Sequence, residues 1–194
     1  MDRVFIIHGW DSHPSEGCFP WLKSELDKES FEVIAPAMPD PLHPRIETWV
    51  AFLAEQVGTP DEHTFFVGHS IGCQTILRYL ETLPANTKIG GAVLLAPWIH
   101  LTDEACEDAE DFEIAKPWLE TPLQWDTIKS HSNTFIAIFS DDDPLVPLTD
   151  SKIFEEKLGT RTIIEQSKEH FSGSSGITEL SSLLSAVIEL RQQG

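Results

Sequence analysis

One stretch in the first half of the chain constrains the fold more than any other. Residues 65–72 read Phe-Phe-Val-Gly-His-Ser-Ile-Gly, and an apolar helical pattern follows as far as Leu80. An apolar run that leads into Gly-x-Ser-x-Gly and then into a helix predicts a sharp strand–turn–helix. Gly68 and Gly72 have a steric reason, because a Cβ at either place would clash where the strand and the helix approach closely. Ser70 at the apex then presents its hydroxyl above the sheet.

The motif alone is weak evidence, because glycine and serine are common and a tight turn often contains both. Its context of strand and helix favours a nucleophile elbow, in which a serine hydroxyl is exposed to a base. The question for the rest of the chain is whether an acid and a histidine follow in the right order, each after a strand.

Short apolar runs alternate with helical patterns along the chain. Several of these runs are almost continuously apolar, which is typical of parallel strands covered on both faces. The strand candidates are residues 4–7, 31–35, 64–67, 92–96, 134–139 and 161–165. The helix candidates are residues 46–57, residues near 20–28 and 150–158, and a C-terminal stripe of Ile177, Leu180, Leu184, Val187 and Ile188. This alternation predicts one α/β domain over residues 1–194, with a mostly parallel sheet and helices on both faces.

The segment from residue 98 to residue 131 is the exception to the alternation. It is long and acidic, it carries Trp98, Trp118 and Trp125, and it interrupts the strands. One interpretation is a small lid or cap beside the site, and the other is a surface excursion with one or two helices. Both interpretations stay open on the sequence.

The charge of the chain excludes whole classes of partner. Its formal value is −19, from 32 acidic and 13 basic side chains. Such a surface repels phosphate groups, so we expect no nucleic-acid binding and no binding to anionic membranes. The densest acidic run is residues 103–111. We interpret it as a solvated, solubilising segment, and the alternative is an acidic rim that disfavours anionic substrates.

Other kinds of site lack a motif. Three widely spaced cysteines, Cys18, Cys73 and Cys106, predict free thiols of a reducing compartment. Seven of the eight histidines show no metal-ligand spacing and no glycine-rich phosphate motif occurs, so we expect neither a metal nor a cofactor. No apolar run approaches the length of a membrane span and the first residues lack a signal-peptide pattern, so we expect a cytoplasmic protein.

An acid and a histidine follow Ser70, each after a strand candidate. Residues 134–139 run into three consecutive aspartates and a proline. Asp143 is the preferred acid, because the following proline makes a rigid turn; Asp142 is the alternative, and a plain turn is the simpler interpretation of all three. His170 is the only histidine after these acids. The order Ser70, Asp143, His170 is that of a serine–acid–histidine triad on an α/β scaffold.

The first strand candidate ends in His8-Gly9-Trp10. In an elbow architecture, the loop after this strand and the residue after the nucleophile each supply a backbone N–H to an oxyanion hole. Trp10 and Ile71 are the candidates, and a flexible Gly9 lets the chain turn so that an amide faces the site. Packing at the strand end is the simpler role for the His8 and Trp10 side chains, and it is compatible with a backbone role.

These features together resemble the α/β-hydrolase superfamily, and more narrowly the small serine hydrolases grouped with retinoblastoma-binding protein nine. The matching stretches cover nearly the full length: His8-Gly9-Trp10, Phe19-Pro20-Trp21-Leu22, Ala37-Met38-Pro39-Asp40-Pro41, Gly68-His69-Ser70-Ile71-Gly72, Ala96-Pro97, Asp143-Pro144 and His170-Phe171. The resemblance implies a compact fold with a six-stranded sheet and a triad of Ser70, Asp143 and His170. The chain departs from the group in two ways. No cysteine lies in the L-x-C-x-E pattern associated with retinoblastoma-protein binding, so that partner is not carried over, and Glu169 stands where many hydrolases have glycine.

We therefore expect a serine hydrolase, namely a carboxylesterase that acts on small uncharged acyl esters. Candidates for its acyl pocket, each of which also suits the core, are Trp10, Phe19, Trp98, Trp118 and Trp125. The alternative is a non-catalytic protein-binding module on a hydrolase scaffold, because a fold does not establish a function. The three catalytic residue types argue against that alternative, since a pure binder has no chemical need for them. The sequence identifies no protein partner.

Overall fold

A single parallel sheet organises the protein. The computed structural model describes residues 1–106 and 108–193, so Glu107 of the acidic run and Gly194 lie outside the described residues. Six strands pair in parallel in the order β2-β1-β3-β4-β5-β6. The strands are β1 Arg3–Ile7, β2 Glu32–Ile34, β3 Thr64–His69, β4 Gly91–Leu95, β5 Phe135–Ser140 and β6 Arg161–Glu165. All six strand candidates and the expected parallel sheet are confirmed.

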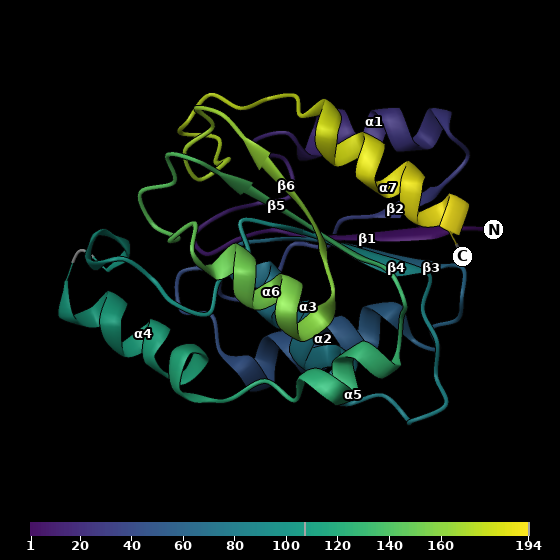
Figure 1. Ribbon diagram of the computed structural model, residues 1–194, viewed down its shortest axis with the longest axis horizontal. Coiled ribbons are helices and arrows are strands. Elements are labelled where there is room, and N and C mark those ends of the chain that lie inside the picture. The colour runs from purple at the N-terminus through teal and green to yellow at the C-terminus, as the bar shows by residue number, and fades with distance from the viewer. Residues whose placement is uncertain (107, 194) are drawn as a thin grey trace.

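Helices cover both faces of this sheet (Figure 1). Helices α1 (Phe19–Lys28) and α7 (Ser181–Gln193) lie on one face; α2 (Ile46–Val57), α3 (Ile71–Glu81), α5 (Trp125–Ser130) and α6 (Asp150–Leu158) lie on the other, with α4 (Ala109–Glu120) at its periphery. Every residue of β3, β4 and β5 is buried between the two layers, which explains their continuous apolar sequences. Over the described residues, none of the helices has both the length and the hydropathy to cross a membrane.

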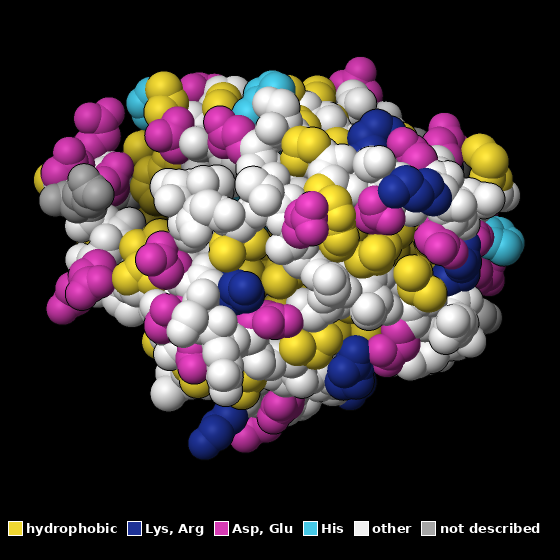
Figure 2. All heavy atoms as spheres, turned by 90° about the horizontal axis from the view of Figure 1, so that it is seen from above, with side chains coloured by type: hydrophobic (Ala, Val, Ile, Leu, Met, Phe, Trp, Pro, Cys, Tyr) yellow, Lys and Arg dark blue, Asp and Glu magenta, His cyan; other side chains and the backbone are white. Residues whose placement is uncertain are grey.

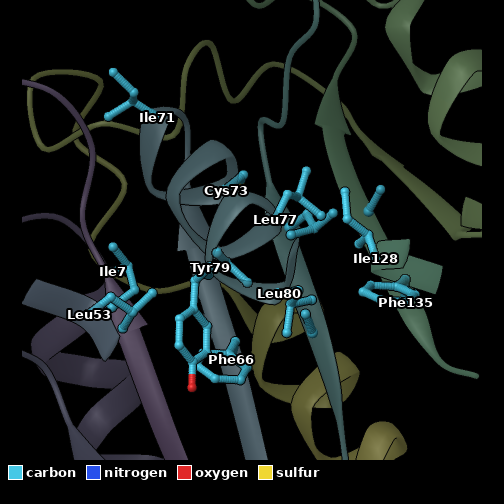
Figure 3. Close-up of a cluster of buried hydrophobic side chains, with 14 of the residues drawn as sticks. Ile7, Leu53, Phe66, Ile71, Cys73, Leu77, Tyr79, Leu80, Ile128 and Phe135 are labelled. Atoms are coloured by element: carbon cyan, nitrogen blue, oxygen red, sulfur yellow. The ribbon is translucent and has the colours of Figure 1, made fainter. Parts of the chain in front are cut away.

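Helix α3 lies at the centre of the larger of two apolar cores. All of its residues from Ile71 to Leu80 are buried. Figure 3 shows this core, in which the rings of Tyr79 and Phe66 lie 5.7 Å apart between their centroids. A helix that is enclosed on all sides has little freedom to shift, so the turn immediately before it is also held in place.

The C-terminal helix differs from its predicted stripe. It begins at Ser181, so Ile177 lies before the helix, and the residues buried along it are Leu183, Ala186, Val187 and Leu190. Leu180 also precedes the helix, although it is buried and its carbonyl accepts the Leu184 N–H at 3.3 Å. Apolar residues just before a helix can continue its spacing of apolar positions. The sequence pattern therefore predicts a start that is earlier than the observed one at Ser181.

The segment from 98 to 131 folds as a 3₁₀ turn at Asp103–Ala105 followed by α4 and α5. Asp108 caps α4, because its carboxylate accepts two N–H groups of the first turn at 2.8 and 3.1 Å. Trp118, near the end of α4, is buried and its indole N–H donates to the Pro44 carbonyl at 3.0 Å. The end of α4 is therefore anchored in the body of the protein.

Candidate active site

The order of the strands puts two of the expected site segments next to each other. The loop after β1 leads to α1 on one face of the sheet, whereas the turn after the neighbouring β3 leads to α3 on the other face (Figure 1). Such a switch of direction opens a crevice at the carboxyl edge of a parallel sheet. Trp10 follows β1 and Ser70 follows β3 at this edge.

The turn at Ser70 has the strained backbone of a sharp elbow. Ser70 has φ 53° and ψ −120°, a region that residues other than glycine rarely adopt. A Cβ at Gly68 would lie 2.8 Å from the Cys73 nitrogen, and one at Gly72 would lie 2.7 Å from the His8 carbonyl oxygen. The predicted steric reason for both glycines is confirmed, because each lets a backbone approach that any larger residue would block.

The acid that contacts His170 is Asp143. His170 Nδ1 and Asp143 Oδ2 are 2.8 Å apart, and the Asp143 side chain is only 3% exposed. The other carboxylate oxygen accepts the N–H groups of Leu145 and Val146 at 2.8 and 3.0 Å. The expected rigid turn is thus present, and it fixes both oxygens of the carboxylate.

The alternative acid, Asp142, has a different partner. Its Oδ1 accepts the Ser140 hydroxyl at 2.7 Å and the Glu169 N–H at 2.8 Å. These two hydrogen bonds, that of Ser140 first, lower the pKa of the Asp142 carboxyl. Asp141 also binds the backbone of the histidine loop, because its Oδ1 accepts the Ser167 N–H at 2.9 Å. The first two aspartates therefore tie down the loop that carries the histidine, and the third contacts its imidazole.

The loop around His170 is strained. Ser167, Glu169 and Phe171 all have positive φ, at 54°, 47° and 56°. Such conformations cost roughly 1–3 kcal/mol each and persist only where surrounding contacts enforce them. Glu169 stands where many hydrolases have glycine, and its left-handed backbone is one that glycine adopts without strain.

One cleft of about 1080 Å³ brings the expected site residues together. Its lining includes Ser70, His170, Trp10 and Ile71. Of the five aromatic candidates for the acyl pocket, Trp10, Phe19 and Trp98 line the cleft, whereas Trp118 and Trp125 pack in or against the core. Among the described residues, the hydrogen bonds of His170 run to Asp143 and His69, and none joins it to Ser70.

The two backbone N–H groups expected to form the oxyanion hole have no acceptor among the described residues. Neither the Trp10 N–H nor the Ile71 N–H donates a hydrogen bond to any described residue. The loop that carries Trp10 is fixed by the buried His8, whose Nε2 accepts the Met38 N–H at 2.9 Å and whose Nδ1 donates to the Gly9 carbonyl at 2.8 Å. Gly9 has no positive φ, and a Cβ at this position would lie 2.9 Å from His69 Nδ1.

His69 is the site residue that the sequence did not single out. Its Nε2 donates to the backbone carbonyl of His170 at 2.7 Å, across 101 positions of the chain. Burial, followed by the neighbouring His170, lowers the pKa of His69 to about 3, and burial also lowers the pKa of His8. Both side chains are therefore neutral at physiological pH. Only the position of His69 inside the elbow motif hinted at a role.

The charges along the cleft have one sign. Its lining contains five carboxylates and, over the described residues, no lysine or arginine. The five are Asp11, Glu16, Glu104, Glu110 and Asp111. Figure 2 shows acidic side chains gathered at the end of the molecule where α4 begins. The predicted acidic run therefore borders the cleft and is not only a distant surface segment.

Cys18 is among the residues that line this cleft. Cys18, Cys73 and Cys106 are all free. Burial raises the pKa of the Cys18 thiol to about 11, and burial also raises the pKa of the Cys73 thiol, so both stay protonated at neutral pH. Within residues 1–106 and 108–193, no group of three or more histidine, cysteine, aspartate or glutamate side chains is arranged to hold a metal ion.

Comparison with known families agrees with this architecture. The model of a family described as serine hydrolase matches residues 4–188. The chain belongs to the serine hydrolase family. It is 31% identical over 184 residues to YdeN of Bacillus subtilis (strain 168), covering 92% of this chain and 90% of that protein. It is also 26% identical over 168 residues to the serine hydrolase RBBP9 of Rattus norvegicus, covering 86% and 80% of the two chains.

The solved structures give the same assignment. The crystal structure of the ydeN gene product from B. subtilis superposes with a TM-score of 0.88 at 27% identity, over 99% of this chain and 100% of that one. The expected α/β-hydrolase fold and the resemblance to the retinoblastoma-binding-protein-nine group are thereby confirmed. The protein is an enzyme, a serine hydrolase.

The lowered pKa values of His8 and His69 make stability depend on pH. Unfolding returns both to a pKa near 6.5, so below that pH the unfolded chain binds more protons than the folded one. The free energy of unfolding should therefore be largest above about pH 6.5 and decrease as the pH falls from 6.5 towards 3. Urea denaturation at a series of pH values measures this.

A matched pair of variants tests whether His69 causes this pH dependence of the free energy of unfolding. His69→Gln removes one of the two titrating groups and should give a shallower decrease. The same substitution at His63, whose side chain is 64% exposed, provides the comparison for replacing a surface histidine. A wild-type slope in His69→Gln would show that this histidine is not the source.

Proposed function

We propose that this serine hydrolase is a carboxylesterase that acts on small uncharged acyl esters through Ser70, His170 and Asp143. One observation carries the proposal: a histidine bonded to a nearly buried carboxylate at 2.8 Å lines the same cleft as a serine on a strained elbow. This combination of a partly exposed serine, a base and an orienting acid is suited to nucleophilic acyl transfer.

The hydrogen bond to Asp143 assigns the roles of the two imidazole nitrogens. Nδ1 of His170 carries a proton towards the carboxylate, so Nε2 is the basic nitrogen. Ser70 Oγ attacks the ester carbonyl carbon while Nε2 takes its proton. The tetrahedral intermediate then expels the alcohol, which receives that proton, and water hydrolyses the acyl-enzyme in the same way. Asp143 stays ionised and stabilises the imidazolium.

The Trp10 and Ile71 N–H groups are the proposed donors to the developing oxyanion. Both residues line the cleft with Ser70, and neither amide has an acceptor among the described residues. Ile71 also begins α3, so the positive end of the helix dipole lies behind the reacting oxygen. One such donor is worth roughly 10²–10³ in kcat.

The cleft supports a small, uncharged acyl group. A volume of about 1080 Å³ suits a small-molecule ester. Apolar contacts are offered by Phe19, Trp98, Leu101, Ile114 and Leu145. The carboxylates among the lining residues raise the cost of bringing in an anion. Trp98, Leu101 and Ile114 of the segment from 98 to 131 line the cleft, and we propose that this segment acts as a small cap over the acyl site.

We also propose a cytoplasmic location. All three cysteines are free thiols, including the partly exposed Cys106. Proteins of reducing compartments keep cysteines in this form.

Removal of the nucleophile should abolish turnover. Ser70→Ala should lower kcat for p-nitrophenyl esters by roughly 10⁴–10⁶, and a fluorophosphonate should label wild type but not the variant. Ser172→Ala, which changes another serine of the cleft, should retain activity and labelling. Esters of increasing acyl length would report the depth of the pocket. Equal hydrolysis by wild type and Ser70→Ala would refute the proposal.

The two neighbouring aspartates should differ sharply. Asp143→Asn should lower kcat by about 10³–10⁴, because the histidine loses its orienting acceptor and adopts the wrong tautomer. Asp142→Asn should cost less than about ten-fold, because the asparagine oxygen still accepts the Glu169 N–H. Steady-state kinetics on one ester compares them, and a larger loss at Asp142 would assign the acid to that residue.

The charge of the cleft should discriminate between acyl groups. An ester whose acyl chain ends in a carboxylate should have a kcat/KM about ten-fold below that of a neutral ester of equal length, and added salt should narrow the gap. The double variant Glu104→Gln/Glu110→Gln should narrow it as well, since both residues line the cleft. A preference that responds to neither change would mean that shape, and not charge, sets the selection.

A further inference from the structure

The buried His69 touches each segment that carries the proposed chemistry. It immediately precedes Ser70 in the elbow. Its ring lies 4.9 Å from that of His170 between centroids, and its Nε2 donates to the His170 carbonyl at 2.7 Å. On the other side, a Cβ built on Gly9 would lie 2.9 Å from His69 Nδ1. One side chain therefore lies between the nucleophile turn, the base loop and the loop after β1.

The hydrogen bond to the His170 carbonyl defines the tautomer of the His69 imidazole. A carbonyl oxygen only accepts, so Nε2 carries the proton of His69. The side chain lies in a buried position with no carboxylate bonded to it, and its pKa is lowered to about 3. His69 is therefore a neutral donor with a fixed tautomer at neutral pH. A permanently neutral donor suits a fixed structural contact and not proton transfer.

The loop that receives this hydrogen bond needs external restraint. Ser167, Glu169 and Phe171 are all in left-handed conformations, on both sides of His170. The aspartates after β5 hold the N–H groups of Ser167 and Glu169, which lie before the histidine. The carbonyl of His170 itself is held by His69. Without that contact, the peptide between His170 and Phe171 loses its partner from the elbow side and can relax towards an unstrained conformation.

We propose that His69 is a positioning residue, which sets the place of the His170 imidazole relative to Ser70 by holding the His170 backbone. This inference rests on the proposed function, because it assigns His170 as the base. A displacement of a catalytic group by about 1 Å can cost 10²-fold in rate. Loss of the hydrogen bond should therefore act on kcat, whereas KM should change little because the apolar cleft residues remain.

The sharpest test compares two amides of different reach. Glutamine places a neutral N–H at nearly the distance of histidine Nε2, so His69→Gln should keep kcat within about five-fold of wild type. Asparagine is one methylene shorter and cannot reach the carbonyl, so His69→Asn should lower kcat about 100-fold with KM within about two-fold. The proton NMR signal of His170 Nδ1–H, bonded to Asp143, should shift or broaden in His69→Asn only.

A distant histidine provides the control for stability. His131 is also fully buried and its Nδ1 donates to the Thr87 carbonyl at 2.8 Å, but it lies at the opposite edge of the sheet from the cleft, where its carbonyl accepts the Ile89 N–H. His131→Phe should lower the melting temperature without changing kcat of the folded protein. A kcat for His69→Asn within about two-fold of His69→Gln would overturn the positioning role.

The outcomes also separate this inference from the function on which it rests. If wild type shows no Ser70-dependent hydrolysis, the proposed function fails. If wild type is active but the kcat of natively folded His69→Gln is lower by 100-fold or more, the positioning role fails while the proposed function stands. This comparison needs only wild type and His69→Gln, so it holds even where His69→Asn does not fold.

Discussion

The close approach of helix α3 to the end of strand β1 is the contact on which the rest of the site depends. Gly72, in the first turn of the helix, faces the carbonyls of Ile7 and His8 at a distance that leaves no room for a side chain. This contact draws the elbow against the neighbouring strand, so Ser70 and the loop of Trp10 share one cleft. A single steric requirement thus brings together the proposed nucleophile and both proposed oxyanion donors.

The cost of this arrangement is concentrated at one edge of the sheet. The non-glycine residues with positive φ that follow strands at their carboxyl ends include Asp11, Ser70, Ala96, Ser167, Glu169 and Phe171. Each is a departure from low-energy backbone of order 1–3 kcal/mol. The two apolar cores offset it, because α3 and the strands β3 to β5 are buried throughout. The strained residues named above lie at the carboxyl edge of the sheet, whereas the buried helix and strands that support them are regular.

The sequence predicts what depends on local pattern. Strand ends and chain order suffice to name Ser70, Asp143 and His170 as the candidate triad, since parallel strands bring their carboxyl ends to one edge of the sheet. The choice of Asp143 over Asp142 rested on a following proline, and the structure puts its carboxylate on the imidazole. The side-chain partners of His8 and His69 are different: Met38 and His170 lie 30 and 101 positions away. No local pattern encodes such distances, and Gly9, expected to be flexible, makes space for His69.

The neutrality of His69 has a consequence for the proposed base, His170, beside it. The two rings are 4.9 Å apart, so two positive charges there would repel each other by roughly 3 kcal/mol at an effective dielectric constant of about 20. In the proposed acyl transfer, that repulsion would oppose formation of the imidazolium at His170. Burial of His69 prevents it, because desolvation keeps the second imidazole uncharged. Among the described residues, Asp143 is the carboxylate that is bonded to one of these two rings, that of His170. His69 can therefore hold the backbone of the His170 loop through its hydrogen bond while remaining uncharged itself.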